Sequence, residues 1–80
     1  MTGADLKLLK ASVDKVVRII CYDGEILTAK VDFVFEDDED LIYDLISTTK
    51  ESRYEKHDKQ PAYLIKFKDI DRVEPLKQTT

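Results

Sequence analysis

Apolar residues occupy every second position from residue 27 to residue 35, and this pattern constrains the fold more than any other part of the sequence. The positions are Leu27, Ala29, Val31, Phe33 and Phe35. Successive side chains of a β-strand point to opposite faces of a sheet, so five matches to a period of two predict a long strand with one buried face. A slip of one residue would bury Thr28, Lys30 and Asp32, so the register is strongly specified.

The neighbouring strands supply the rest of the expected core. Val17, Ile19 and Cys21 alternate before Asp23 and Gly24, a dipeptide typical of a tight hairpin turn. Farther along the chain, the inward positions are Leu41, Tyr43 and Leu45, then Tyr63, Ile65 and Phe67. Because Phe33 lies on the predicted core face, Phe33→Ala is expected to cost about 3–5 kcal/mol of folding free energy.

One helix and five strands complete the predicted architecture. Thr2 and Asp5 form a capping-box pattern, and Leu6, Leu9 and Val13 make an apolar stripe, which predicts a helix over about residues 4–14. Three later strands are expected at 41–46, 63–68 and 71–74, with Pro61 opening the second of them. Asp69 and Ile70 are expected to form the turn before the last strand, which Pro75 should stop, and residues 47–60 to extend a hairpin arm or form one or two helical turns.

The short helix, followed by strands with tight turns, predicts a mainly β fold: a five-stranded Sm-like or SH3-like small barrel. The barrel would span about residues 16–75, with the helix across one open end and residues 76–80 as a tail. The chain has only 80 residues, one cysteine and one histidine. An internal disulfide is therefore excluded and a zinc cage is improbable, which leaves self-association to stabilise a small core. No apolar run is long enough to span a bilayer or to act as a signal peptide, so we expect a cytoplasmic location.

The run from Val17 to Gly24, followed by Leu27, Ala29 and Val31, resembles the first half of the Sm-like family, which includes bacterial Hfq. Residues 67–75 are similar to the closing strands of Hfq-type chains. The resemblance implies a ring in which the fourth strand of one subunit pairs with the fifth strand of the next. The candidate interface residues are then Tyr63, Leu64, Ile65, Lys66, Phe67, Asp71, Arg72 and Val73.

Negative charge is concentrated in the segments that such a ring would turn toward RNA. The resemblance places residues 36–40 and 68–71 there, and their acidic side chains are Glu36, Asp37, Asp38, Glu39, Asp40, Asp69 and Asp71. The family's RNA-contacting asparagine has no counterpart, because the chain contains no asparagine. Phosphate neutralisation by basic residues supplies most nucleic-acid affinity, so RNA binding is expected to be weak, and a basic protein segment or a divalent cation is favoured instead.

No residue pattern in the sequence predicts catalysis, a cofactor or a dedicated metal site. Cys21 is interpreted as a small buried apolar residue, and His57 as a solvated loop residue. The apolar residues expected to point away from the core are Ile20, Tyr22, Ile26, Val34, Ile42, Ile46 and Leu64. They are too many for a solvated monomer and favour a subunit interface. The sequence thus predicts a non-enzymatic, homo-oligomeric Sm-like interaction or scaffold module, with an RNA-binding Sm-like protein as the alternative and an enzyme as the reading with least support.

Overall fold

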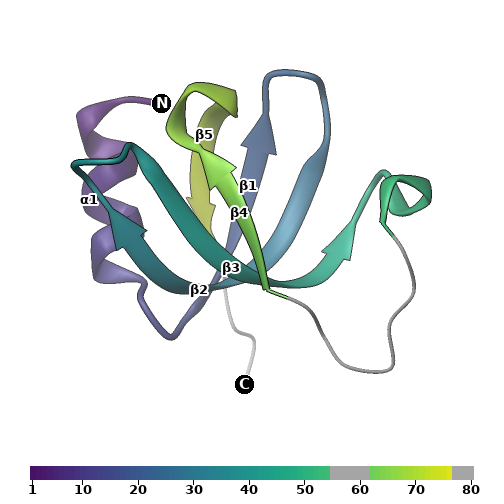
Figure 1. The fold of residues 1–80 in the computed structure, drawn as a ribbon, viewed down its shortest axis with the longest axis horizontal. Coiled ribbons are helices and arrows are strands. Elements are labelled where there is room, and N and C mark those ends of the chain that lie inside the picture. Colours follow the sequence, from purple (N-terminus) through teal and green to yellow (C-terminus); the bar gives the residue numbers. More distant parts are fainter. Residues whose placement is uncertain (55–61, 77–80) are drawn as a thin grey trace.

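The computed structural model describes residues 1–54 and 62–76 and shows one antiparallel sheet of five strands with an N-terminal helix (Figure 1). The elements are α1 (Gly3–Ala11), β1 (Val16–Cys21), β2 (Ile26–Phe35), β3 (Asp40–Thr48), β4 (Ala62–Lys66) and β5 (Ile70–Pro75). Two short 3-10 helices, η1 (Glu51–Arg53) and η2 (Phe67–Asp69), follow β3 and β4. The mainly β class is confirmed. Among the described helices, none has the length and apolar character needed to cross a membrane.

The sheet is open, with β4 and β5 at its two edges. Its strand order is β4-β3-β2-β1-β5, and every neighbouring pair is antiparallel. The three residues of η2 join β4 to β5. The sheet is strongly curved, and in Figure 1 β4 runs up to η2 while β5 runs down from it. Among the described residues no ladder pairs β4 with β5, so each of them has one strand neighbour.

Helix α1 begins as its sequence predicts and ends earlier. The Thr2 hydroxyl accepts a hydrogen bond from the Asp5 N–H, and the Asp5 carboxylate accepts one from the Thr2 N–H, which completes the capping box. The helix stops at Ala11, so the predicted end near residue 14 is wrong. Leu9 is fully buried, whereas Val13 lies beyond the helix and is exposed. The helix packs against β5 and β2.

The buried core follows the predicted facing in most of the sheet. Its apolar members are Leu9, Val17, Ile19, Cys21, Leu27, Ala29, Val31, Leu41, Tyr43, Ile70 and Val73. Leu45, Tyr63, Ile65 and Phe67 are partly buried and pack against this core, as expected. Ile70 is an exception to the prediction: it is fully buried and opens β5, where a turn residue was expected. Burying it fastens the start of β5 to the core.

A β-bulge reverses the facing of the last part of β2. Val31 pairs with Tyr43 and Phe33 with Ile42, so Asp32 is an extra residue without a partner on β3. An extra residue shifts the alternation by one position. Phe33 is therefore 60% exposed and Phe35 39% exposed, while Val34 packs against the core. The predictions that Phe33 and Phe35 point inward and Val34 outward are wrong.

The segments after β3 differ from the prediction in extent. β3 runs to Thr48, and η1 follows it, so the first part of the predicted arm consists of strand and one helical turn. Pro75, expected to stop the last strand, is itself the final residue of β5. His57, Pro61 and most of the predicted tail lie outside the described residues.

Candidate functional site

The two acidic segments singled out in the sequence lie side by side. The turn at residues 36–39 joins β2 to β3, and the backbone N–H of Phe67 in η2 donates to the Glu39 carbonyl oxygen at 2.8 Å. The exposed acidic residues of the two segments and of the start of β5 are Glu36, Asp37, Asp38, Glu39, Asp69 and Asp71. Glu36 is bridged to Lys10 at 3.1 Å. The structure thus brings the turn and η2 together in a strongly acidic region.

Asp40 does not share the exposure of this acidic region. It is the first residue of β3, its exposed fraction is 6%, and its Oδ2 accepts a hydrogen bond from Lys66 Nζ at 3.1 Å. Asp40 was grouped in sequence with the exposed loop, and this placement is wrong. The ion pair neutralises the buried carboxylate and connects β3 to β4, which makes Asp40 a structural residue.

The candidate interface residues divide between the core and the two edges of the sheet. Tyr63, Ile65 and Phe67 turn inward, and Val73 is buried. The interface candidates that are exposed on the edge strands are Leu64, Lys66, Asp71 and Arg72. One backbone donor of β5 is already used, because the Val73 N–H donates to Asp5 Oδ1 at 3.0 Å. The pKa of Asp5 is lowered: burial raises it, but hydrogen bonds from the N–H groups of Thr2 and Val73 and from the Thr2 hydroxyl outweigh that effect.

A hollow of about 380 Å³ lies where the β1–β2 turn faces η2 and β4. Tyr43, Tyr54 and Tyr63 line it together with Cys21 and Glu25. The Tyr63 ring lies 5.1 Å from that of Tyr54, edge to face, and 6.0 Å from that of Tyr43. The hollow is therefore walled by aromatic rings on one side and by the turn on the other.

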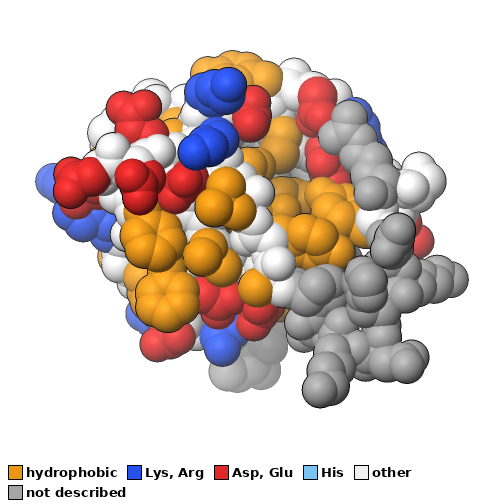
Figure 2. All heavy atoms as spheres, viewed as in Figure 1, with side chains coloured by type: hydrophobic (Ala, Val, Ile, Leu, Met, Phe, Trp, Pro, Cys, Tyr) orange, Lys and Arg blue, Asp and Glu red, His pale blue; other side chains and the backbone are white. Residues whose placement is uncertain are grey.

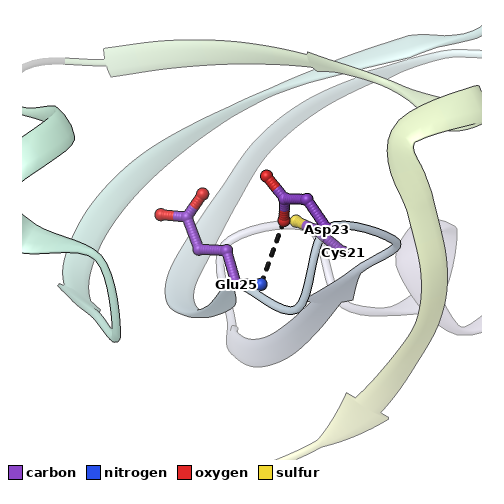
Figure 3. A group of neighbouring side chains, drawn as sticks. All are labelled: Cys21, Asp23 and Glu25. Carbon is purple, nitrogen blue, oxygen red and sulfur yellow. Dashed lines mark hydrogen bonds between the residues drawn. The ribbon is translucent and has the colours of Figure 1, made fainter.

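Three potential ligands project from that turn (Figure 3): Cys21, Asp23 and Glu25, with donor atoms within 4.8 Å of one another. Gly24 has a φ of 91°, which permits the tight reversal, and Asp23 Oδ1 accepts a hydrogen bond from the Glu25 N–H at 3.0 Å. Glu25 is only 4% exposed. In the sequence only Cys21 of these three was considered as a candidate. Cys21, Asp23 and Glu25 occupy every second position through the turn, and this spacing could have predicted that their side chains converge.

Hydroxyl groups hold the Glu25 carboxylate in place. Its Oε2 accepts hydrogen bonds from the Tyr54 hydroxyl at 2.7 Å and from the Thr48 hydroxyl. Burial raises the pKa of Tyr43 to about 12, and the negative charge of Glu25 adds to the shift. Burial also raises the pKa of Tyr54, as does its hydrogen bond to Glu25. Both phenols are consequently neutral at physiological pH, and Tyr54 remains a hydrogen-bond donor.

A thiolate with two carboxylates is a donor set that Zn²⁺ accepts, and structural zinc sites take four protein ligands. Asp69 lines the same hollow without joining the group of converging donors. The Glu25 carboxylate, in turn, is already bound by two hydroxyls. Hydrogen bonding within the fold therefore accounts for the geometry of Glu25, and we assign this cluster a structural role in joining the β1–β2 turn to β3 and η1.

No protein-family model, curated protein or solved structure matches this chain. We therefore infer the function from its own residues, and the edges of the sheet and its exposed surfaces carry that inference.

Proposed function

We propose that this chain is a non-enzymatic interaction module of the Sm-like type that assembles into a cyclic homo-oligomer. In the ring, β4 of one subunit pairs with β5 of the next. The observation that supports this proposal is the open sheet, in which the described parts of β4 and β5 each pair with one strand and not with each other. Edge strands present backbone N–H and C=O groups that act as a template for another chain.

Pairing unlike edges produces a heterologous contact, in which each subunit offers β4 to one neighbour and β5 to the other. Such contacts generate a ring when the rotation between subunits closes. Assembly would add much to the stability of this fold, because an 80-residue domain without an internal disulfide has a small core of its own. Assembly would also extend the sheet and cover exposed side chains on both edge strands.

The bond between Asp5 and the Val73 N–H sets a condition on this assembly. A neighbouring β4 that pairs along β5 must displace the Asp5 carboxylate from that donor. The exchange replaces one hydrogen bond with another, so its net cost is a fraction of a typical bond, about 1 kcal/mol or less. Asp5 therefore competes with a neighbouring β4 for the Val73 N–H and covers this donor in the free subunit.

The distribution of charge supports protein binding over the RNA binding that the family resemblance implies. The turn at residues 36–39 holds four exposed acidic residues, and Asp69 lies in the adjoining η2. In a ring, every additional subunit repeats this charge, which raises the repulsive potential felt by phosphates. The same potential attracts a basic protein segment, so the charge that weakens nucleic-acid binding strengthens protein binding.

The test is the mass of the full-length chain in solution. Light scattering at micromolar concentration is expected to return a multiple of the 9.3 kDa subunit. Asp5→Ala should assemble at a lower concentration than Thr2→Ala, since each variant removes one of the two capping-box bonds but only the first frees the Val73 N–H. A stable monomer in all three proteins would refute the proposal.

A further inference from the structure

The bulge at Asp32 creates a row of outward apolar side chains across three strands. Phe33 on β2 pairs with Ile42 on β3, which pairs with Leu64 on β4. Ile42 and Leu64 each lie between neighbours that turn toward the core, and Phe33 lies between the bulge residue Asp32 and the inward Val34. Phe35, two residues beyond Phe33, extends the row along β2. We call Phe33, Phe35, Ile42 and Leu64 the outer apolar patch, and apolar side chains gather over these strands in Figure 2.

Three members of the outer apolar patch are exposed large apolar residues, and Ile42 between them is half-buried. Phe33 is 60% exposed and Leu64 54% exposed. The Phe33 and Phe35 rings stack with their centroids 6.1 Å apart and an angle of 25° between their planes. A stacked pair presents a broad flat surface to solvent. Contiguous exposed apolar surface of this kind marks an interaction site.

Acidic side chains border the patch at both ends. The turn at residues 36–39 follows Phe35 directly and carries four exposed acids. At the other end, the Asp32 and Asp44 side chains share a hydrogen bond. The basic residues beside these borders compensate only in part: Lys10 is bridged to Glu36, Lys30 lies beside the Asp32–Asp44 pair, and Lys66 is held by Asp40. An apolar centre between two negative borders is therefore the character of this surface.

We propose that the outer apolar patch docks a basic, apolar peptide segment of another protein. Aliphatic side chains of the segment would cover Phe33, Phe35 and Leu64, while its lysines or arginines meet the two acidic borders. A cation over the face of a Phe ring adds attraction of about 0.5–1 kcal/mol at an exposed site. This inference rests on the proposed function, and it deepens that function by naming the class of partner.

Charge decides between a peptide and a nucleic acid as the occupant. Exposed aromatic rings can stack on bases, but single-strand binders combine such rings with a positive groove that follows the phosphates. Here both borders are negative, so a nucleic-acid backbone would be repelled at either end of the patch. A basic peptide satisfies the rings and the borders together.

The experiment measures binding of fluorescent peptides to the full-length chain by anisotropy. The probe is a peptide in which lysine and leucine alternate. Two control peptides replace lysine with glutamate or leucine with serine, and oligo-A and oligo-U serve as RNA probes. The lysine–leucine peptide should bind best, and rising salt should weaken its binding without abolishing it, because screening affects only the charged contacts.

Matched variants locate the site. Phe33→Ser combined with Phe35→Ser should weaken binding of the lysine–leucine peptide at least about tenfold, as expected on losing central aromatic contacts. Ile46→Ser should leave it unchanged, since Ile46 is a comparably exposed apolar residue on β3 beyond Asp44. Circular dichroism spectra of all the variants, compared with that of the unaltered chain, check that they are folded.

Three outcomes would overturn the inference. Equal binding of the glutamate–leucine peptide would show that the patch binds apolar peptides without regard to charge. Tighter binding of RNA would assign the patch to nucleic acid. A change in oligomeric mass of the double Phe variant, measured by light scattering, would assign the patch to contacts between subunits. That last result differs from failure of the edge-strand assembly, which would appear as a monomer in the unaltered chain.

Discussion

The two halves of β2 have the same alternating pattern, but its apolar residues are buried in the first half and exposed in the second. In the first half, Leu27, Ala29 and Val31 have exposed fractions of 1% or less, whereas Phe33 and Phe35 in the second half face solvent. The larger, aromatic residues are thus the ones outside. The comparison teaches that a period of two assigns residues to one face only as far as the strand itself contains no extra residue. The ladder also shifts between Thr28 and Ala29, but there the extra residue is Ile46 on β3, so the facing of β2 is unchanged.

The difference follows from how many strands flank each half. From Leu27 to Lys30, β2 pairs with both β1 and β3. The ladder with β1 ends at Lys30, and Val31 forms a single bridge with Val13. Beyond Val31, β2 continues with β3 as its strand partner. A segment paired on one side can bulge with little loss of hydrogen bonding, and bulges are common where pairing ends. Asp32 lies at this point.

Single-residue deletions in the two halves provide the strongest way to break the comparison. Deleting Asp32 removes the extra residue and leaves Phe33, Val34 and Phe35 on the faces that they now occupy. Deleting Lys30 shifts the buried and exposed positions of the regular half against each other, so we expect that variant to unfold. Chemical denaturation of both variants checks this expectation. A Lys30 deletion as stable as the Asp32 deletion would show that the register in the first half is not specified.

Alanine substitutions sharpen the comparison. Leu27→Ala should destabilise the fold by about 2–5 kcal/mol, because it opens a cavity in the core. Phe33→Ala should cost about 1 kcal/mol, mainly the loss of stacking on Phe35. This value replaces the larger cost expected from the sequence. Denaturant midpoints measured in one buffer compare the two variants, and equal losses would mean that Phe33 is buried in solution.

The smallest expected effect concerns the bulge residue and pH. Burial raises the pKa of Asp32 above its ordinary value of 3.8, and the hydrogen bond and charge of Asp44 add to the shift. Because the folded state then binds the proton more tightly than the unfolded state, the stabilisation is present below pH 3.8 and is lost as the pH rises through the raised pKa. The stability of Asp32→Asn relative to that of the unaltered chain should therefore increase as the pH is raised from below 3.8 to neutral.

Thermal unfolding of both proteins, once below pH 3.8 and once at neutral pH, measures this increase in relative stability. Asp38→Asn is the matched control, since it removes the same charge from an exposed position in the 36–39 turn. The control should show a smaller dependence on pH. If both variants respond equally, the effect arises from net charge and the Asp32–Asp44 contact has no influence on stability.

Local interactions explain the parts of the fold that the sequence determined by itself. The capping box of Thr2 and Asp5 and the tight turn at Gly24 involve residues no more than a few positions apart. Their chemistry is therefore complete within the segment that forms them. The inward facing of β1 and of the first half of β2 is also determined, since a regular strand has only two faces and one of them is apolar.

The remaining features depend on contacts between distant segments, and only the tertiary structure decided them. Burial of Glu25 became possible because Thr48 and Tyr54 bring hydroxyls to it from β3 and the end of η1. The exposure of Phe33 and Phe35 depends on where the β1 ladder ends and on an extra residue opposite β3. A bulge adds no distinctive residue type, so the alternation of Leu27 to Phe35 reads the same with or without it. Which half of that strand is buried was settled by the number of its neighbours.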